Sequence, residues 1–412
     1  MTDRIDNDYD IVIAGGGMIG VSLALALAPL GLRIAVVEAV ARSADAQPSF
    51  DDRSTALSRS SQRTFEALGL WPSIKAASTP ISHIHVSDRG RFGFSHIDAA
   101  EQKVEALGYV VINRVLGKVL DSALQSAAGV DMLCPARISD VTMAADNVSV
   151  AAETADGRRQ FTCRLLVAAD GARSSVREML GIGAQYTDYR QHAVIGNLQP
   201  EKLHRNHAYE RFTDDGPIAV LPTADDRVTF VWTLPPREAD AAMLLTDEVF
   251  TRRLQEAFGY RLGRFSKTGA RARYPLILSK ANSLSAARGV LVGNAAHGLH
   301  PVAAQGFNLG LRDVAALADC IADALADGGN DPGSAAVLER YVDWRRDDQQ
   351  KLVYFTDGLV RLFGSRRRSL KVLRDAGMLG FDLLPGVRGV FARHTMGLSG
   401  ELPRLSRGVA LK

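Results

Sequence analysis

The sequence predicts an α/β fold in which a domain with a parallel sheet comes first, a β-rich section follows, and helices close the chain. Three observations predict this order. A strand, an apolar helix and a second strand open the chain, strand patterns dominate the middle, and residues 334–395 show mostly helical, amphipathic spacing. The length of 412 residues exceeds that of one ordinary domain and suggests two or three.

The first elements form a complete β-α-β unit. Residues 10–14 are almost entirely apolar and predict a buried strand. An apolar helix is expected over residues 18–30, with Gly31 suited to its end, and a second strand over residues 32–38. This unit places a nucleotide-binding type of domain at the start of the chain.

The turn between the first strand and the helix carries Gly15-x-Gly17-x-x-Gly20, and Glu38 ends the second strand. Gly15 permits a tight turn, Gly17 lets the backbone approach a pyrophosphate, and Gly20 allows the helix to pack closely on the strand. The N–H groups at the helix start attract phosphate, and Glu38 can accept a hydrogen bond from a ribose hydroxyl. A flexible turn is the alternative for the glycines alone. The surrounding strands, helix and acid favour a dinucleotide site, without distinguishing FAD from NAD.

Further along the chain, alternating and helical patterns predict the remaining elements. In order, they are a helix over residues 53–70 packing through Leu57, Phe65 and Leu68, antiparallel strands over about 81–98, a helix over 113–127, short strands over 136–168 with a turn at Asp156-Gly157, strands over 182–268 with a helix near 246–258, a buried strand over 289–293, and a helix over about 306–326.

Two further motifs follow predicted strands. Asp170-Gly171 lies between a buried strand and a helix start, and an aspartate that caps the helix is the structural alternative. The second motif runs from Gly293-Asn294-Ala295-Ala296-His297 through His300-Pro301 to Gly306-Phe307-Asn308-Leu309-Gly310. The helix beginning near Gly306 can hold an electron-rich edge of a ligand at its N-terminus. Ordinary loop histidines are the alternative for His297 and His300, and no carboxylate cluster beside them indicates a metal site.

Composition argues against several classes of protein. The chain is 46% hydrophobic and 23% charged, which is typical of globular proteins, and its net charge of +3 gives no support for nucleic-acid binding. Its three cysteines, Cys134, Cys163 and Cys320, form no C-x-x-C pair, so neither a zinc site nor a disulfide framework is indicated. The N-terminal ten residues contain no apolar run, and no stretch reaches the ~18 apolar residues of a membrane span. We therefore expect a cytoplasmic protein.

Taken in order, the glycine turn, Asp170-Gly171 and the block from Gly293 to Gly310 resemble the single-component FAD-dependent aromatic hydroxylases, the p-hydroxybenzoate hydroxylase-like family. Residues 51–57 and the tail segments 381–385 and 393–397 are most similar to its ubiquinone-biosynthesis branch, the 2-polyprenyl-6-methoxyphenol hydroxylases. The resemblance covers nearly the whole chain, with residues 182–268 the least diagnostic.

This resemblance implies a Rossmann-type FAD-binding domain with an inserted β-rich substrate domain and a helical C-terminal tail. The expected limits are residues 1–180 for the FAD-binding domain with substrate-side strands at about 80–104, residues 181–269 for the substrate domain, residues 270–345 for the return to the FAD-binding domain, and residues 346–412 for the C-terminal helical region.

The resemblance also implies roles for individual residues. Gly15, Gly17, Gly20 and Glu38 would hold the ADP half of FAD. Arg53 and Arg114 would approach the cofactor, with a surface arginine as the alternative for either. Asp170 and Gly171 match a motif linked to FAD and NAD(P)H use, whereas Gly293 and Asn294 match the segment at the ribityl chain, where much of the family has aspartate instead of Asn294.

At the flavin ring, the resemblance places Pro301 beside the isoalloxazine, and His300 and Pro301 are the candidate catalytic residues. The backbone N–H groups of Phe307 and Asn308, after Gly306, would face the pyrimidine edge, where reduced flavin carries negative charge.

The implied activity is hydroxylation of the aromatic ring of a polyprenylated phenol in ubiquinone biosynthesis, with NAD(P)H reducing FAD and O2 adding to give a flavin C4a-hydroperoxide. NAD(P)H would bind without a Rossmann domain of its own, because the chain has a single glycine motif. A base that favours phenolate would help. The candidates are His192, Tyr189, His204 and Tyr209, with core or surface roles as the alternative for each.

Two other functions remain alternatives. The first is another flavoprotein of the same fold, a halogenase or a polyprenyl reductase, although Trp71, Trp232 and Trp344 provide no Trp-x-Trp-x-Ile-Pro halogenase signature. The second is a non-catalytic scaffold of a biosynthetic assembly, against which the intact glycines and flavin-facing block argue.

The C-terminal section is basic. From Asp343 to Lys412 there are 14 Lys and Arg against 7 Asp and Glu. Residues 359–396 combine apolar side chains with Arg366, Arg367 and Arg368, a pattern that suits an anionic lipid surface or a partner in a biosynthetic complex. The alternative is that this segment packs on the FAD-binding domain. The first interpretation predicts a protein peripheral to the inner membrane.

Overall fold

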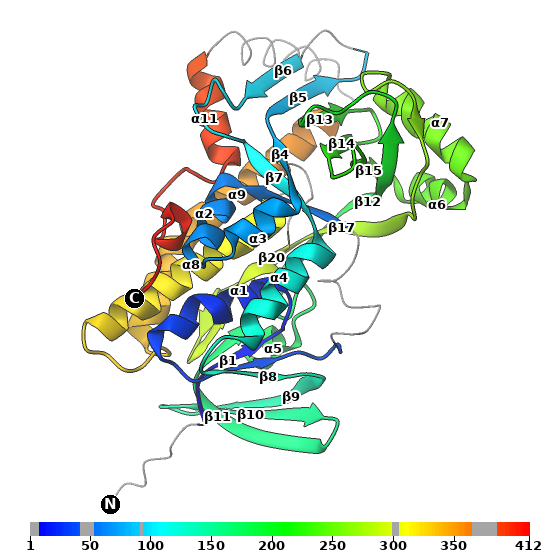
Figure 1. Cartoon of the computed structure of the whole chain (residues 1–412). Helices are drawn as coiled ribbons and strands as arrows, with labels where there is room; N and C mark the ends of the chain where they lie inside the picture. Colours follow the sequence, from blue (N-terminus) through cyan, green and yellow to red (C-terminus); the bar gives the residue numbers. More distant parts are fainter. Residues whose placement is uncertain (1–7, 42–52, 91–93, 299–304, 365–384) are drawn as a thin grey trace, which may run out of the picture.

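The computed structural model describes residues 8–41, 53–90, 94–298, 305–364 and 385–412, and its strands form three sheets (Figure 1). The first sheet has the order β18-β19-β11-β1-β2-β8, with β10 and β9 attached beside β11. Its strands are β1 (Tyr9–Ala14), β2 (Ile34–Val37), β8 (Val130–Leu133), β9 (Ala136–Met143), β10 (Val148–Thr154), β11 (Gly157–Ala168), β18 (Ser285–Ala286) and β19 (Gly289–Leu291).

The centre of this sheet is parallel. Strand β1 pairs in parallel with β2 on one side and β11 on the other, and β19 continues the parallel run beyond β11. The apolar run in β1 is fully buried because parallel sheets are covered on both faces. The predicted opening unit is confirmed: helix α1 (Met18–Leu27) and a short 3-10 turn, η1 (Ala28–Leu30), separate β1 from β2.

Helices α1, α4 (Asn113–Gln125) and α8 (Gln305–Ala326) pack together beside the parallel sheet. Every residue of α8 from Asn308 to Ala322 is buried, so this helix forms part of the core instead of an amphipathic cover. Helix α9 (Ala335–Gly364) packs against α8. These helices confirm the predictions over residues 113–127 and 306–326.

The second sheet has the order β20-β17-β12-β15-β14-β13-β5-β6, with β16 beside β12. Its strands are β5 (His83–Asp88), β6 (Phe94–Asp98), β12 (Ala184–Pro200), β13 (His207–Phe212), β14 (Pro217–Pro222), β15 (Val228–Leu234), β16 (Phe265–Ser266), β17 (Ala272–Ala281) and β20 (His297–Gly298). Helices α6 (Pro236–Leu244) and α7 (Asp247–Phe258) cover one face of this sheet (Figure 1). Helix α7 was predicted, whereas α6, which begins at a proline, was not.

A small third sheet, β3-β7-β4, consists of β3 (Ser54–Ser58), β7 (Gly108–Ile112) and β4 (Ser78–Ile81). The prediction of a helix over residues 53–70 is wrong for its first part. Residues 54–58 pair antiparallel with β7 and bury Leu57 in that position, so tertiary pairing overrides the local pattern. The helix α2 (Arg59–Ala67) begins only at Arg59, where Ser58 accepts a capping bond from the Ser61 N–H. Helix α3 (Trp71–Ala76) follows it.

Part of the basic C-terminal section is bound to α8. Arg345 donates to Asp313 over 2.8 Å, and Arg404 donates to Asp319 over 2.7 Å. Ala392 of helix α11 (Pro385–Thr395) is buried in a small apolar cluster. Met396, just after the helix, is buried in the same cluster. Arg345 and Arg404 lie outside residues 359–396, the segment for which packing on the FAD-binding domain was the alternative. Within that segment, Ala392 and Met396 pack with Ile81, Ile97 and Ala208, and residues 365–384 lie outside the described chain, so the alternative stays open.

Among the described residues, no helix is both long and apolar enough to cross a membrane. The same residues contain no group of histidine, cysteine and acidic side chains arranged to hold a metal ion.

Candidate cofactor and substrate site

The three sequence motifs meet at one edge of the parallel sheet. Gly15 follows β1, Ala169 and Asp170 follow β11, and Gly293 follows β19, and these three strands are neighbours. Backbone hydrogen bonds tie their ends together, with Ala169 N–H donating to Ala14 O and Val292 N–H to Ala168 O. The carboxyl edge of a parallel sheet is where ligands bind in such folds.

The glycines of the first motif are required by the structure. Gly15 has φ +105°, and a Cβ there would lie 2.5 Å from Ala169 O. A Cβ on Gly20 would lie 1.9 Å from Gly15 O, because α1 crosses the end of β1 so closely. Gly17 is the residue before α1 and supplies no side chain to cap it. The first turn of α1 contains no acidic residue, so its N–H groups and positive end suit a phosphate.

Glu38 lies at the end of β2 and is 9% exposed. Its two carboxylate oxygens accept the backbone N–H groups of Gly16 and Val40, each over 2.7 Å. These bonds fix the carboxylate beside the glycine turn. Each oxygen keeps a second acceptor position, which is the capacity that a ribose hydroxyl needs.

Asp170 has the capping role that was the structural alternative. Its carboxylate accepts the Ser174 hydroxyl and the Val176 N–H at the start of α5 (Ser175–Met179). Gly171 has φ +89°, and an added Cβ would meet no atom within 4 Å. The predicted role of Asp170 and Gly171 toward FAD and NAD(P)H stays a prediction.

The segment after β19 is held by a buried carboxylate. Asp313, on α8, accepts the Gly293 N–H over 3.0 Å, contacts His297 Nε2 at 2.6 Å, and accepts Arg345 and Gln349 on its other oxygen. Burial opposes ionisation of Asp313, but His297 and Arg345 outweigh it and hold its pKa below the usual range. Asp313 was not predicted as a site residue, although an aspartate inside an apolar helix was the available signal.

Asn294 differs from its neighbours in exposure. It lies in a short 3-10 turn, η3 (Gly293–Ala295), and is exposed whereas the residues on both sides are buried. Gly293 itself has φ +60°, and a Cβ added there would lie 3.2 Å from the Ile19 side chain of α1, whereas a Cβ added to Gly310 of α8 would lie 3.1 Å from the Gly293 α-carbon. The turn therefore presents the Asn294 side chain outward at the edge where the three motifs meet.

The start of α8 is bonded to the small sheet. The Asn308 side chain accepts the Ser58 N–H over 2.8 Å and the Ser61 hydroxyl over 2.7 Å, and it donates to Ala56 O over 2.9 Å. The Phe307 ring stacks on Phe65 at 6.4 Å. Because the Asn308 side chain is used in this way, only backbone groups at the α8 start remain for the predicted flavin edge. A Cβ on Gly306 would meet no atom of the described residues within 4 Å.

The two predicted arginines lie in different surroundings. Arg53 lies before β3 with its guanidinium 4.8 Å from the centre of the Tyr274 ring, so it connects the cofactor side with the second sheet. Arg114 is exposed in the first turn of α4. The predicted catalytic residues His300 and Pro301 lie outside the described residues.

The arrangement fits FAD on structural grounds. Two glycines leave no space for a side chain, an uncapped helix start lies beside them, and a fixed carboxylate lies at the end of the next strand. Among the described residues, no atom lies within 4 Å of the position that a Cβ on Gly171 or Gly306 would take. These are the features that a dinucleotide needs for its pyrophosphate and ribose.

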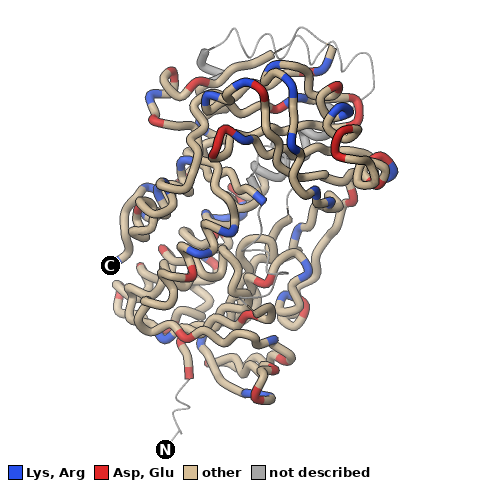
Figure 2. Tube along the Cα trace, turned by 45° about the vertical axis from the view of Figure 1, so that its right-hand side comes forward, with Lys and Arg blue, Asp and Glu red and all other residues tan. Residues whose placement is uncertain are grey.

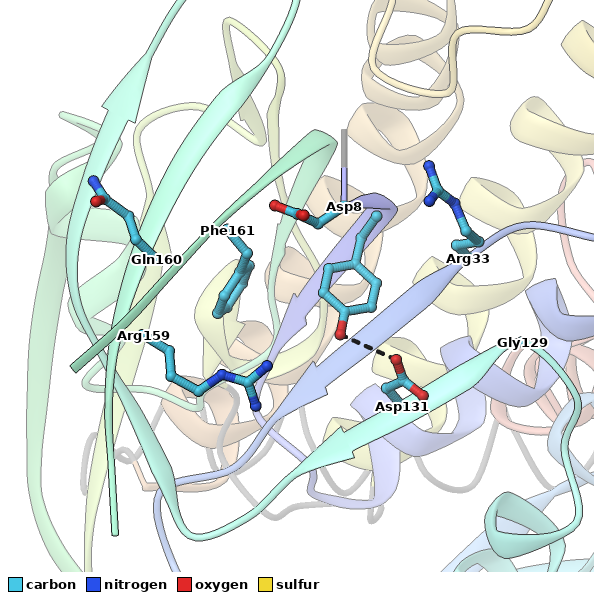
Figure 3. A pocket seen from close by; sticks show the side chains of 8 residues that line it. Asp8, Arg33, Gly129, Asp131, Arg159, Gln160 and Phe161 are labelled. Carbon is cyan, nitrogen blue, oxygen red and sulfur yellow. Dashed lines mark hydrogen bonds between the residues drawn. The ribbon is translucent and has the colours of Figure 1, made fainter. Parts of the chain in front are cut away.

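The cavity in Figure 3 lies elsewhere. It has a volume of about 320 Å³ and is found where β1, β2 and β8 begin, at the opposite edge of the sheet from Gly15. Its lining residues are Asp8, Tyr9, Arg33, Gly129, Asp131, Arg159, Gln160 and Phe161. Tyr9 donates to Asp131 over 3.0 Å within it. A cofactor held by the glycine turn therefore does not occupy this cavity.

The candidate phenol bases are not gathered at one place. Tyr209 packs edge-on against Phe258 of α7, at a centroid distance of 5.7 Å, on the face covered by α6 and α7. His192 lies directly across from Leu234, whose side chain packs in the apolar cluster under α6 and α7, so His192 is on that face as well. Both ring nitrogens of His204 are engaged by backbone groups. Tyr189 lies in an irregular stretch of β12, between Asp188 and His192.

Comparison with known proteins identifies the family and the fold of this chain. A family model described as FAD binding domain matches residues 8–356. Ubiquinone hydroxylase UbiL of Rhodospirillum rubrum is 38% identical, and the alignment covers 100% of this chain and 95% of that protein. The 3-demethoxyubiquinol 3-hydroxylase of Escherichia coli is 31% identical, with coverage of 94% and 98%. The solved structure of p-nitrophenol 4-monooxygenase PnpA from Pseudomonas putida has a TM-score of 0.79 at 18% identity, covers 95% of this chain and 98% of that one, and shows the shared fold. These findings confirm the predicted resemblance and fold class.

Proposed function

The chain belongs to the FAD binding domain family, and from this premise we propose that it is a monooxygenase that hydroxylates the aromatic ring of a polyprenylated phenol in ubiquinone biosynthesis. FAD is its cofactor, and NAD(P)H is the reductant typical of the family. The observation that carries the proposal is the meeting of three motifs at the ends of β1, β11 and β19, in a chain whose full length aligns with a ubiquinone hydroxylase.

In this proposal the cofactor edge holds FAD mainly with backbone groups. The start of α1 and its glycines would take the pyrophosphate, and Glu38 would take a ribose hydroxyl. Asn294 would bond the ribityl chain, and the N–H groups at the start of α8 would face the pyrimidine edge. When bound, FAD supplies the redox chemistry that joins NAD(P)H, O2 and the ring.

The substrate side has to position the ring and keep water out. The second sheet is the proposed substrate domain, and Arg53 against Tyr274 is one contact between it and the cofactor side. The proposed substrate domain consists of residues 181–269 together with the substrate-side strands at about 80–104. Strands β12 to β16, β5 and β6 share the second sheet, and β17 and β20, from the proposed return to the FAD-binding domain, join it as well. Exclusion of water from the ring would protect the reactive oxygen chemistry.

The long isoprenoid chain of such a substrate favours contact with a membrane or a lipid-carrying partner. Figure 2 shows basic and acidic positions interspersed along the described chain, with no single basic band. The described basic residues Arg345 and Arg404 are paired with aspartates of α8. Contact with anionic lipid or a biosynthetic complex is therefore proposed for Arg366, Arg367 and Arg368, which lie outside the described residues.

The function is tested by deleting the gene and analysing quinone intermediates by mass spectrometry. The deletion strain should accumulate a prenylated ring that lacks one hydroxyl, and the intact gene should restore the final quinone. An unchanged quinone profile in the deletion strain, in the absence of a second hydroxylase gene, would contradict the proposal. The accumulated compound would also identify the ring carbon.

A further inference from the structure

The two faces of the second sheet differ in what covers them. On one face, Val194, Phe230 and Trp232 pack against Phe250 and Phe258 of α7. Successive side chains of a strand point to opposite faces, so the neighbours of these residues lie on the other face. On that other face, Val86, Ile195, Ala219, Leu221 and Val231 are only half-buried.

This second face is turned toward the cofactor side. At β17, Tyr274 receives Arg53 at 4.8 Å. At β13, Ala208 is buried in an apolar cluster with Val110 of β7, and Ala56 of β3 packs against the same cluster. The backbone oxygen of Ala56 is the atom that accepts Asn308 at the start of α8. The face is thus in contact at two points, Tyr274 and Ala208, with residues 53–56, and these residues are bonded to the start of α8, where the flavin edge is proposed.

Glu210 lies on the same strand as Ala208 and four strands across the sheet from Tyr274. Glu210 is two residues beyond Ala208, a distance of about 7 Å along β13. Counting only residues that point to this face, the row that contains Tyr274 is the next row after that of Glu210. Its own row runs across the sheet through Ser95, Val86, Glu210, Ala219, Val231, Ile195 and Ala272. Glu210 is the only ionisable side chain in that row. The next carboxylate by register is Asp88, diagonal to Glu210 on β5.

The Glu210 carboxylate has no hydrogen bond or ion pair with any described residue. Its half-buried position on an apolar face removes it from water without compensation, and this raises its pKa to about 7. A carboxyl group in such a place costs stability whenever it is charged. An apolar side chain at this position would give a more stable fold. A carboxyl group there is therefore suited to binding a ligand with a polar group that can pair with it.

Resting on the proposed function, we propose that Glu210 is a catalytic residue that touches the substrate hydroxyl and accepts its proton. In this step the phenolic O–H bond breaks, the proton moves to a Glu210 carboxylate oxygen, and the electron pair stays on the phenolate oxygen. No electron is transferred. The ring becomes richer in electrons, which is what oxygen insertion requires, and the proton later passes to water.

The first test compares Glu210→Gln with the wild-type holoenzyme on a short-chain prenylphenol. The variant should keep its FAD and bind the phenol with a similar Kd, measured by the change in flavin absorbance. Its kcat at pH 7 should fall on the order of 100-fold, the scale of general base catalysis, and should recover as the pH rises toward the pKa of the phenol. Wild-type kcat should instead rise through pH 7 and level off.

The matched control is Glu256→Gln, which removes the same charge from an exposed position on α7, on the other side of the sheet. It should retain the wild-type kcat and pH profile. If Glu210→Gln keeps both as well, the proposal for Glu210 is overturned. If that variant fails to fold, Glu210→Asp takes its place: it should keep the pH dependence with reduced kcat, and unchanged kcat would overturn the proposal.

A second readout does not depend on activity. Because the folded-state pKa of Glu210 is raised, its contribution to stability is lost as the pH rises through 7. Glu210→Gln should therefore melt at a higher temperature than wild type at pH 8.5 and at the same temperature at pH 4.5. Equal shifts at both pH values would refute the unpaired, desolvated position that the proposal needs.

The two proposals fail in different ways. If the wild-type enzyme with NAD(P)H and O2 hydroxylates no prenylphenol, the proposed function fails and the assignment of Glu210 falls with it. If wild type hydroxylates and Glu210→Gln does so equally well, only the assignment of Glu210 fails.

Discussion

The cofactor edge and the substrate-facing side of the second sheet differ in how each is built. At the cofactor edge, glycines, strand ends and helix starts meet within short stretches of sequence, and backbone N–H groups fix Glu38 at the glycine turn. On the sheet face, the residues that lie together come from seven strands spread between Val86 and Tyr274. Backbone geometry therefore defines the first region, and side chains brought together by register define the second.

This difference explains which substitutions should matter most. In the first region an added side chain removes the space that a phosphate needs, so FAD binding should be lost completely. In the second region, replacement of one side chain changes chemistry but leaves the binding surface in place.

Gly17→Val should abolish FAD binding and not merely slow turnover, because its side chain would occupy the position of the pyrophosphate at the start of α1. The flavin absorbance of the purified protein measures this directly. Gly389→Val in α11, where an added Cβ meets no atom within 4 Å, is the control and should retain flavin. A Gly17 variant with a full flavin spectrum would show that the cofactor site is misplaced.

Asp313→Asn should lower the free energy of unfolding by about 3–5 kcal/mol, because it leaves the buried Arg345 without its carboxylate partner on α8. Denaturant unfolding measures the change. Asp323→Asn on the same helix breaks partly exposed pairs with Arg340 and Arg404 and should cost about 1 kcal/mol or less. Equal losses would mean that the buried network does not hold the segment after β19.

The Asp313 network also predicts a pH dependence. Its pKa is held below the usual range in the folded protein, so its stabilising contribution is present above the unfolded pKa of about 4 and is lost as the pH falls toward the folded value. The difference in unfolding free energy between wild type and Asp313→Asn should therefore shrink in acid. A difference that is constant from pH 7 to pH 3 would contradict this.

Much of the first region could be predicted from sequence because its signals are local. The glycine turn, Glu38 and the helix starting near Gly306 were each found by pattern, and β1, α1, β2 and α8 confirm the elements around them. Strand β3 was missed because its pairing with β7 comes from 50 residues further along the chain. Asp313 was missed because its partners on α9 are distant in sequence.

The second region could not be predicted in the same way. The candidate bases were chosen as residue types, whereas the face each occupies depends on register, which one residue of slip reverses. Tyr209 and Glu210 are adjacent, yet Tyr209 faces α7 and Glu210 faces the cofactor side. No local pattern distinguished them.

The smallest effect is expected at the basic tail. Replacing Arg366, Arg367 and Arg368 together by Glu should leave folding and FAD content intact, because no motif of the cofactor edge includes them. It should weaken binding to anionic liposomes and lower activity on a long-chain substrate several-fold more than on a short-chain analogue. Equal losses on both substrates, or unchanged liposome binding, would count against the tail as a membrane or partner contact.

The most direct test of the central claim is isotope incorporation. The purified FAD enzyme is incubated with NAD(P)H, a short-chain prenylphenol and ¹⁸O2, and the product is analysed by mass spectrometry. A ring-hydroxylating monooxygenase should yield a product with one added oxygen that carries the ¹⁸O label, and label in the water should not enter the ring. A product without label from ¹⁸O2, or oxidation of NAD(P)H with no change in any prenylphenol offered, would contradict the account.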